Sequence, residues 1–568
     1  MITWARPSLA LAAIAITASR SFTVNNSASR SPRPCADRVT GVNYSDTTTH
    51  DLAYSYDAEG HVTSRVDGSG TTTYTYDDLG RLLSVANTAG GATISYTYDL
   101  AGAIASETDA HGPTDYHYDP AHQLSYLIYQ QGGGPAMMLF DYDNAGRRTD
   151  TWLQTDATHS TWGGHSHTTY DTSGRVTQIL AQQGPASAPV TVLDQQYCYQ
   201  AGTTPTGGCT PTAAADRSNI QWMKNSHAGE ASAYSYDDHS RLTKDVLTGG
   251  TNPRTYTFSY DTAGNRLTAV TTGTTPSSQS LAYNPGNQVS STGYGYDGAG
   301  NRTTGDAITA AYDTAGQMTA STKAGTTTNY SYAGTNSNEL LSEATTGGDT
   351  YAYAYGRTDQ NGLPGIEEVA YTHAGTTANA YIAHDNTGLP VLLTTSTGSA
   401  CMYVYDGHNP AGLVTNFGSL AYLLNFDPYG GTTVAQNSGG SGYVDNPYGY
   451  AGGIQSHTTQ LIKFGTRWYD PTTGTWTQQD TLNAPLDPTN GNRYIYAADN
   501  PINNADPTGM GGLGDIFGGI GLAAGIGLAL ILAPEVTVPA LIVGGIGIYA
   551  GGGLAGYGAG ECFGGGNC

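Results

Sequence analysis

One short motif recurs along most of this chain and constrains its fold more than any other feature: Tyr, any residue, Tyr and Asp, followed closely by Gly. YTYDDLGRL at residues 74–82 is a clear copy, and early copies begin 20 to 24 residues apart. A self-similar unit of this length indicates a repeat architecture, in which one small unit stacks on the next. Clear copies cover residues 54–60, 74–82, 96–102, 116–120, 141–148, 170–176, 234–242, 258–267, 294–302 and 312–318, and weaker ones cover 403–409 and 425–430.

Each copy of the motif has the pattern of a β-hairpin. Side chains alternate along a strand, so the two tyrosines lie on one face. Asp begins a turn by accepting hydrogen bonds from the backbone ahead of it, and Gly takes the left-handed conformation that a bulged hairpin requires. One hairpin cannot bury its face alone, so we predict that the hairpins stack into a continuous winding sheet. The repeated Asp and Tyr then have structural roles and no catalytic one.

The composition favours an all-β fold wound into a hollow shell over residues 44–445, with an insertion at 181–230. The chain has 42 Tyr against 8 Phe. A tyrosine ring with a hydroxyl that can reach water suits a sheet around a wide, partly wet interior. The alternatives are an incompletely closed shell, or a solid β-propeller or β-solenoid. A propeller blade, however, needs four strands in about 40 to 50 residues, and this unit supplies two.

The net charge of −24 argues against a nucleic-acid partner, because phosphates require a basic surface. The acidic excess suits a soluble protein that is secreted or exposed at a cell surface. The sequence contains neither a Gly-rich phosphate loop between a strand and a helix nor a Gly-x-Ser-x-Gly nucleophile motif in an α/β setting. The lack of both motifs weighs against an NTPase or an α/β-hydrolase, and no cofactor is expected.

The N-terminal residues differ in composition from the repeats. Residues 1–20 contain Arg6, the apolar run LALAAIAITA and small residues after it, which is the pattern of a secretory signal. Residues 21–43, with several Ser, Arg and Pro, are predicted to be a disordered lead-in. The alternative is a misassigned start within a longer gene.

Residues 446–510 carry a second set of motifs in a fixed order. Together they resemble the RHS repeat-associated core domain, which ends the shells of RHS/YD-repeat proteins, and the hairpin motif resembles that family's YD repeat. In the family this core closes a large β-shell, and in many members it also cleaves its own chain. The motifs are Arg467-Trp-Tyr-Asp-Pro471, Asp480, Tyr494-Ile-Tyr496 and Asp506-Pro-Thr-Gly509.

The resemblance implies that Asp480 and Asp506 are a catalytic pair assisted by Arg467, and that the chain is cut between Met510 and Gly511. Two close carboxylates cannot both ionise, so one can hold a proton while the other activates water. The planar fork of arginine can orient a carboxylate. As an enzyme, the chain would at most be an aspartic-type peptidase that acts on itself.

Two departures from the family pattern affect this interpretation. Met510 stands where the family has leucine, a change that nearly conserves volume. The inserted stretch APLDPTNGN carries Asp487, a rival for the first carboxylate. The alternative is that Asp470, Asp487 and Asp506 are ordinary Asp-Pro turn residues.

The C-terminal segment 511–568 is apolar, rich in Gly and free of Lys and Arg. Its apolar runs within 516–550 could form a helical hairpin that contacts a membrane. In the RHS family the segment after the core is variable and often a toxin. The resemblance therefore implies a membrane-active toxin segment, and the alternative is a membrane anchor or an inert tail.

Three histidines, His159, His165 and His167, lie close together in THSTWGGHSHTTYD. His165 and His167 would share a strand face and could bind a metal. Since no Asp, Glu or Cys accompanies them at ligand spacing, we favour a polar hairpin tip and expect no metal site.

The six cysteines leave the disulfide pairing open. In an exported protein, two pairs could close disulfides. Spacing alone neither requires nor excludes either pair. The pairs are Cys198 with Cys209 and Cys562 with Cys568, while Cys35 and Cys401 have no evident partner.

Two functional hypotheses remain at this stage. In the first, the shell encloses its own C-terminal segment as cargo and releases it after Met510 during competition between cells, with an immunity protein or a secretion system as partner. In the second, the chain is a structural or adhesion module without catalysis, held by its apolar tail. Both place the protein outside the cell or at its surface, with membrane contact through residues 516–550.

Overall fold

The computed structural model describes residues 22–28, 37–44, 49–510 and the backbone of 517–518; its gaps are 69, 88–92, 130–135, 157, 213, 335, 360, 397, 408, 416–419, 438–444 and 481–490. The regular structure is almost entirely β-strand, with short 3-10 turns at η1 (Tyr450–Gly452) and η2 (Ala497–Asp499). The predicted all-β class is confirmed.

The first sheet contains the described strands β1 to β21, and each pairs antiparallel with the strand that follows it in the chain. The strands are β1 (Phe22–Ala28), β2 (Asp37–Tyr44), β3 (Leu52–Tyr56), β4 (Val62–Asp67), β5 (Gly70–Tyr76), β6 (Leu82–Asn87), β7 (Thr93–Tyr98), β8 (Ile104–Thr108), β9 (Pro113–Tyr118), β10 (Leu124–Tyr129), β11 (Ala136–Tyr142), β12 (Arg148–Leu153), β13 (Gly164–Tyr170), β14 (Val176–Gln183), β15 (Val190–Cys198), β16 (Trp222–Asn225), β17 (Glu230–Tyr236), β18 (Leu242–Gly249), β19 (Arg254–Tyr260), β20 (Arg266–Gly273) and β21 (Ser277–Ser280).

The second sheet follows the same rule of pairing between consecutive strands. Its strands are β22 (Gly295–Tyr296), β23 (Arg302–Gly305), β24 (Ile308–Tyr312), β25 (Met318–Lys323), β26 (Thr326–Ala333), β27 (Asn336–Thr345), β28 (Thr350–Thr358), β29 (Pro364–His373), β30 (Thr376–His384), β31 (Pro390–Thr395), β32 (Ala400–Tyr405), β33 (Pro410–Thr415), β34 (Leu420–Phe426) and β35 (Thr432–Asn437).

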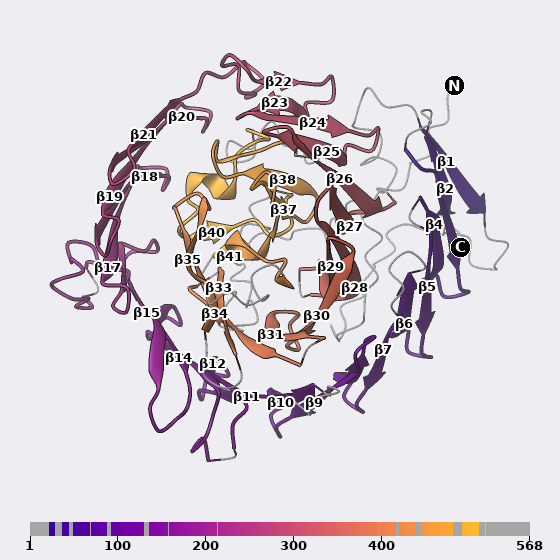
Figure 1. Cartoon of the computed structure of the whole chain (residues 1–568), viewed down its shortest axis with the longest axis horizontal. Coiled ribbons are helices and arrows are strands. Elements are labelled where there is room, and N and C mark those ends of the chain that lie inside the picture. Colours follow the sequence, from indigo (N-terminus) through magenta and orange to yellow (C-terminus); the bar gives the residue numbers. More distant parts are fainter. Residues whose placement is uncertain are drawn as a thin grey trace, which may run out of the picture.

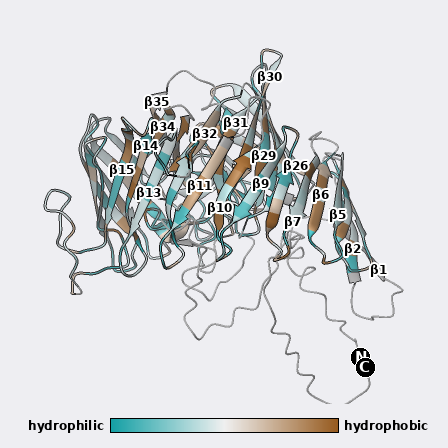
Figure 2. Cartoon of the chain, turned by 90° about the horizontal axis from the view of Figure 1, so that it is seen from below, coloured by the Kyte–Doolittle hydropathy of each residue, from teal (hydrophilic) through white to brown (hydrophobic). Residues whose placement is uncertain are grey.

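The two sheets form one spiral wall. In Figure 1 the first sheet curves around the outside, and the second turns inward so that β28 to β34 lie within it. The C-terminal strands, in orange and yellow, lie inside the spiral. Figure 2 shows the strands standing side by side around the wall, with hydrophobic positions distributed along them. The predicted winding of stacked hairpins is confirmed.

The turn of each repeat follows the predicted chemistry, as the hairpin of β5 and β6 illustrates. Asp77 Oδ1 accepts hydrogen bonds from the backbone N–H groups of Leu79 at 3.0 Å and Arg81 at 2.9 Å. Gly80 has φ +77°, in the left-handed region, and a register shift beside Tyr76 marks a bulge. The carboxylate therefore satisfies the backbone donors of a tight turn.

The hydroxyl of the second tyrosine explains why Tyr is used here and not Phe. In repeat after repeat this hydroxyl donates a hydrogen bond to a backbone carbonyl of the preceding hairpin, as Tyr98 does to the carbonyl of Leu82 at 2.7 Å. The expectation that these hydroxyls reach interior water is thus wrong for the second tyrosine, because the next hairpin lies close enough to use them. The same bond is made by Tyr56, Tyr76, Tyr118, Tyr142, Tyr170, Tyr236, Tyr260, Tyr312, Tyr332, Tyr355 and Tyr405.

The outer and inner parts of the wall are joined by apolar packing and by buried ion pairs. One apolar cluster combines Leu127 and Leu153 of the first sheet with Leu392 and Met402 of the second. Between these layers the space is not completely filled, since a cavity of about 850 Å³ lies among Tyr234, Arg254 and Tyr429 and their neighbours. Buried ion pairs across the layers are Arg65 with Glu339 at 2.9 Å, Glu107 with Arg357 at 3.3 Å and Arg148 with Asp385 at 2.7 Å.

Two segments that we expected to lie outside the regular repeats, 21–43 and 181–230, contain strands of the wall. The stretch 21–43, expected to be disordered, contains β1 and most of β2, which pair with each other. Val42 of β2 is buried, so this stretch adds one more hairpin that buries apolar surface. In the insertion at 181–230, β15 and β16 pair with β14 and β17. The part that leaves the sheet is the loop from 199 to 221.

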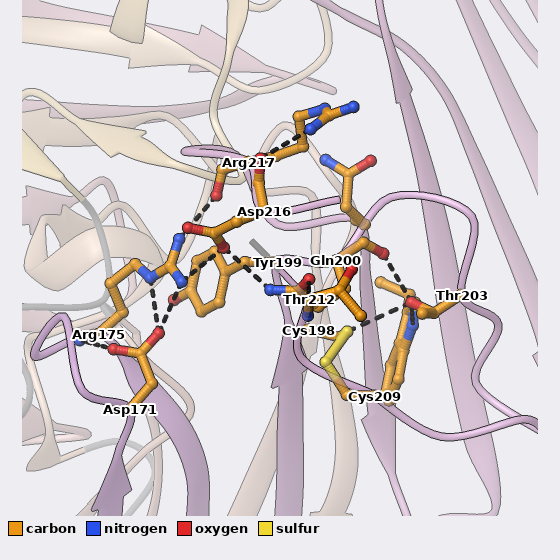
Figure 3. Close-up of a disulfide and its surroundings, with 12 residues drawn as sticks. Asp171, Arg175, Cys198, Tyr199, Gln200, Thr203, Cys209, Thr212, Asp216 and Arg217 are labelled. Atoms are coloured by element: carbon orange, nitrogen blue, oxygen red, sulfur yellow. Dashed lines mark hydrogen bonds and ion pairs between the residues drawn. A yellow bond between two sulfur atoms is a disulfide. The ribbon is translucent and has the colours of Figure 1, made fainter. Parts of the chain in front are cut away.

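That loop is tied to the wall by covalent and ionic contacts (Figure 3). Cys198 and Cys209 form a disulfide across it, which settles the first of the two open pairings. The Arg175 guanidinium binds Asp216 Oδ1 at 2.8 Å and lies 4.2 Å from the centre of the Tyr199 ring. Cys401 is free and buried, while Cys35, Cys562 and Cys568 lie outside the described residues.

Candidate functional site

The described residues of the C-terminal core, 446–480 and 491–510, lie inside the spiral (Figure 1). Its short strands β36 (Ile454–Gln455), β37 (Ile462–Phe464), β38 (Arg467–Asp470) and β39 (Thr475–Trp476) form a small antiparallel sheet. A second pair joins β40 (Asn504–Ala505) to β41 (Phe517–Gly518). The centre of the core is aromatic and fully buried: Tyr450, Phe464, Tyr469, Trp476 and Tyr496 pack together. A chain buried on every side in this way can hold its polar groups in fixed positions.

Hydrogen bonds fix the core against the inner wall. The Trp468 indole N–H donates to the Tyr332 hydroxyl at 2.9 Å. The Tyr494 hydroxyl donates to the Gly300 carbonyl at 2.7 Å. These partners come from different hairpins of the second sheet, so the geometry of the core depends on the assembled wall.

Three residues predicted from the sequence meet in this core: Arg467, Asp480 and Asp506, which we call the core trio. Arg467 Nη2 lies 2.9 Å from Asp480 Oδ2 and 3.5 Å from Asp506 Oδ2. All three side chains are at least nine-tenths buried. One guanidinium group therefore faces both carboxylates in a site with little access to water.

The guanidinium of Arg467 is held from several sides. It stacks on the Trp476 ring with 4.2 Å between the guanidinium carbon and the ring centre. Its Nη1 donates to the Arg493 carbonyl at 3.2 Å, and its Nε donates to the Gly509 carbonyl. The Thr466 hydroxyl donates to the same Gly509 carbonyl at 3.0 Å. Arg467 thus binds the backbone one residue before the predicted cleavage position.

Two glycines allow this close approach of backbones. Gly465 has φ +36°, and a Cβ there would lie 2.0 Å from the Thr508 carbonyl oxygen. Gly509 has φ +62°, and its Cβ would lie 2.6 Å from the Phe464 carbonyl oxygen. Any side chain at either position would separate the 506–510 segment from the strand that carries Arg467.

The two carboxylates have different surroundings. Burial raises the pKa of Asp506 to about 6, and the nearby Asp480 adds to the increase, although Arg467 opposes it. Asp506 Oδ1 also accepts hydrogen bonds from the Thr508 hydroxyl at 3.1 Å and the Met510 N–H at 3.3 Å. Asp506 can therefore hold a proton in mildly acidic solution, and its carboxyl group contacts Met510, the residue at the predicted cut.

A second arginine with two carboxyl groups lies where the core meets the wall, formed by Arg302, Asp470 and Asp306 and called here the wall trio. Arg302 Nη2 lies 2.6 Å from Asp470 Oδ2. Burial acts to raise the pKa of Asp470, but Arg302 and hydrogen bonds outweigh it and leave that pKa low. Burial, together with the charge of Asp470, raises the pKa of Asp306 to about 6. Asp470 is thus an ion-pair residue that also caps the turn at Thr472.

A comparison of the sequence with known families identifies the wall. The Teneurin YD-shell family matches residues 216–502, and the RHS repeat family matches residues 56–93 and 76–114. The first match spans half of the chain. The chain belongs to the YD-shell family of RHS/YD-repeat proteins. The resemblance read from the Tyr-x-Tyr-Asp motif and the core motifs is confirmed.

Two curated bacterial proteins resemble part of this YD-shell chain. One is a tRNA3(Ser)-specific nuclease WapA from Bacillus spizizenii, 27% identical over 281 residues. The other is the tRNA nuclease WapA of Bacillus subtilis, 27% identical over 304 residues. Each match covers 48% of this chain and 12% of the relative. The chain therefore spans a small part of the length of these proteins.

Solved structures show the same fold. The structure of TcdB2-TccC3 has a TM-score of 0.67 at 17% identity and covers 86% of this chain and 27% of the other. TcdB2-TccC3 without its hypervariable C-terminal region also has a TM-score of 0.67, at 16% identity, over 86% of this chain and 26% of the other. The Photorhabdus luminescens Tc holotoxin pore has a TM-score of 0.53 at 14% identity and covers 83% of this chain and 27% of the other. At these identities the similarity is one of fold.

Other residues singled out from the sequence are only partly placed. Asp487, Gly511 and nearly all of the apolar segment 516–550 lie outside the described residues. Within the described part of the YD-shell chain, no helix is long and apolar enough to cross a membrane. The expectation that no Asp, Glu or Cys accompanies the histidines as a ligand partner is wrong, because Asp150 on the neighbouring strand contacts both His165 and His167.

Sequence reasoning also missed parts of the core site. The core trio is surrounded by Arg493, Thr508 and Trp476. The spacing of these residues in the sequence did not indicate that they would lie there. Gly465 could have been noticed, because FGTR joins two aromatic strand segments in the pattern of a two-residue hairpin turn.

Proposed function

We propose that this YD-shell protein encloses its own C-terminal segment and cuts the peptide bond between Met510 and Gly511 with the core trio. The observation that carries the proposal is the position of Arg467. Its guanidinium contacts Asp480, Asp506 and the Gly509 carbonyl together. A carboxyl pair and the backbone leading to the cut are thus joined by one buried side chain.

In the proposed reaction the two carboxyl groups have different roles. Asp480 takes a proton from water as the water oxygen bonds to the Met510 carbonyl carbon, and protonated Asp506 gives its proton to the carbonyl oxygen. When the resulting diol collapses, the C–N bond breaks and the proton on Asp480 passes to the Gly511 nitrogen. A hydroxyl proton of the diol returns to Asp506. The products are a Met510 carboxyl group and a Gly511 amine, and both aspartates recover their starting states.

Arg467 would orient the two carboxyl groups and offset their negative charge. Its charge faces both carboxylates, so it limits their mutual repulsion while the proton moves. Its Nε and the Thr466 hydroxyl hold the Gly509 carbonyl, which orients the bond that follows. Exclusion of water from the aromatic core would strengthen each of these interactions.

We further propose that residues 511–568 are the cargo, a membrane-active toxin segment released in competition between cells. Support for a toxin cargo comes from the curated relatives, whose names describe nucleases that act on tRNA, and from a fold neighbour whose title names a hypervariable C-terminal region. Support for membrane activity comes from the apolar composition of residues 516–550. We propose the corresponding domain division: a signal at 1–20, the wall up to residue 445 with β1 and β2 as its first hairpin, the core over 446–510 and the cargo after it. The protein would act outside the producing cell, with an immunity protein and a secretion partner.

One observation favours the second hypothesis, an adhesion or structural protein without catalysis. The hydrogen bonds of Asp506 to Thr508 and Met510 are those of an ordinary turn carboxylate. In that case the core would only close the shell.

Intact-mass spectrometry of the purified chain separates the two functions. We expect the parent to consist of two pieces that end at Met510 and begin at Gly511, and D506N and D480N to remain whole. D470N, from the wall trio, is the matched control and should be cut. A parent chain that stays whole, or a D506N chain that is cut, would refute the peptidase proposal. Adding the separated segment to dye-loaded vesicles then tests the cargo, since a membrane-active toxin must release the dye.

A further inference from the structure

A side-chain cluster on the outer wall, far from the core in sequence, has the composition of a metal site. It is formed by Asp150 of β12 and His165 and His167 of β13. His165 Nε2 lies 2.8 Å and His167 Nδ1 lies 2.7 Å from the same atom, Asp150 Oδ1. All three ligand atoms lie within 4.8 Å of one another. Within the described residues, this is the one group of three His, Cys, Asp or Glu side chains whose ligand atoms converge in this way.

The strand register brings the three residues together. His165 and His167 are two residues apart on β13 and so share one face. Asp150 lies directly opposite His167 in the antiparallel pairing of β12 and β13. A cross-strand pair places side chains within about 5 Å of each other, so the carboxylate meets both rings.

The cluster faces the outside of the wall. A Cβ on Gly164 would meet the Met402 and Val414 side chains of the second sheet, which lie on the inner side. Alternation along β13 then directs His165 and His167 outward. The side chain of His167 is 39% exposed, so an ion could enter from solvent. Figure 2 shows β13 on the wall, near β14 and β15.

Contacts with neighbouring aromatic side chains hold His165 in place. The His165 ring stacks on Trp152 with ring centres 3.5 Å apart and an angle of 6° between the planes. The Trp152 indole N–H donates to Asp141 Oδ2 at 2.9 Å, and His159 covers the other part of the same indole with ring centres 4.3 Å apart. Such supporting contacts keep a ligand in the orientation that a metal requires.

We propose that Asp150, His165 and His167 bind a divalent transition metal ion of the zinc class on the outer wall, with water in the fourth position. Two imidazoles and one carboxylate suit such ions better than Ca²⁺ or Mg²⁺. A tetrahedral zinc ion with bonds near 2.1 Å keeps its ligands about 3.4 Å apart. The two His–Asp contacts, at 2.8 and 2.7 Å, therefore need to open by only a fraction of an ångström, and all three ligand atoms already lie within 4.8 Å of one another.

Bound metal would join β12 to β13 on the face opposite the apolar packing. The cluster lies at the end of the strand pair where Leu153 is opposite Gly164, so the ion would hold that end of the hairpin together. This role does not depend on cleavage at Met510 and goes beyond the proposed function.

Calorimetric titration of the EDTA-treated full chain with ZnCl₂ tests the proposal. We expect one zinc ion per chain, and at least about tenfold weaker binding in D150N, H165Q and H167Q, since loss of even a supporting contact costs this much. The matched control is H373Q, because His373 also pairs with one aspartate, Asp349, but in the described structure no third His, Cys, Asp or Glu ligand atom converges with that pair. H373Q should bind zinc like the parent.

A second measurement protects against variants that fold poorly. Cu²⁺ bound at the cluster would quench the fluorescence of Trp152, which stacks on a ligand, and W152F should lose that part of the quenching. Zinc should also raise the melting temperature of the parent and H373Q but not that of H165Q. The absence of a saturable single site, or equal binding by the parent and all three ligand variants with unchanged circular dichroism, would overturn the proposal.

Discussion

The core trio and the wall trio contain the same groups, one arginine and two aspartates, yet their surroundings differ. In each, one carboxyl group has its pKa raised to about 6, Asp506 in the core and Asp306 at the wall. Asp306 accepts from the Tyr294 hydroxyl at 2.8 Å, whereas Asp506 accepts from the N–H of Met510. Burial and a shared arginine are therefore not enough to indicate chemistry. What distinguishes the core trio from the wall trio is its contact with the backbone beside the predicted cut.

The largest expected difference between the trios is in cleavage after substitution of the arginine. R467K should slow the cut by about 10²-fold to 10⁴-fold, because lysine cannot contact two carboxylates and a carbonyl with one planar fork. R302K should leave the rate within about threefold, the ordinary context dependence of such effects. Time courses of cell-free synthesised chain on gels give both rates. Equal slowing by the two substitutions would mean that the trios are not functionally distinct.

The stabilities should change in opposite directions when one aspartate of each trio is neutralised. D470N leaves Arg302 buried without its partner and should cost about 3–5 kcal/mol of unfolding free energy. D506N removes a carboxylate whose folded pKa is raised to about 6 and should stabilise the chain by about 3 kcal/mol at pH 7. Urea unfolding at pH 7 measures both values. The proposed contrast fails if D506N destabilises the chain as much as D470N does.

The pH dependence of the cut follows from Asp506 acting as the acid. Its raised pKa, about 6, means that the protonated form is lost as pH rises through 6. The cleavage rate should fall about tenfold per pH unit above 6 and level off below it. The free energy of unfolding should also increase as the pH falls. The charged form of Asp506 is disfavoured in the folded chain, so the cost of burying it disappears as the pH falls below about 4. Transfer of freshly synthesised chain from pH 8 to a series of buffers measures the rate profile. A rate that rises with pH would instead assign Asp506 as the base.

The smallest effect concerns the repeat and not the trios. Y98F removes the hydrogen bond to the Leu82 carbonyl and should cost about 1 kcal/mol. Y197F is the matched control, because the buried Tyr197 hydroxyl has no hydrogen-bond partner in the described structure. Its removal should be neutral or slightly stabilising. Equal losses in the two variants, measured by urea unfolding, would show that the hydroxyl bond does not join neighbouring hairpins.

The features that the sequence predicts well are local ones. The Asp77 turn is closed by contacts within four residues, so its pattern is visible in the motif itself. The partners of the core trio were inferred through the family resemblance, since Arg467 and Asp506 are distant in sequence. The structure brings them together, and their catalytic role stays a prediction.

Features that depend on register or on packing between layers were not predicted. Asp150 meets His167 only because β12 and β13 pair in one register, and the turn between them is too long to fix that register from sequence. Asp306 lies near Asp470 only after the core enters the wall. The hydrogen bond of Tyr98 to Leu82 likewise needs two stacked hairpins, which composition alone could not specify.

Within each of the two sheets of the wall, strands pair with the next strand in the chain, and this has a consequence for the order of folding. Such a sheet has very low contact order, so each hairpin can add to the growing edge as soon as it leaves the ribosome or a secretion channel. The core needs partners from distant hairpins, including Tyr332 and Gly300, and it can be positioned only after those hairpins exist. We therefore expect the core trio to be assembled last. The proposed cut would then come after enclosure, and the segment beyond Met510 would stay attached until the compartment around it is built.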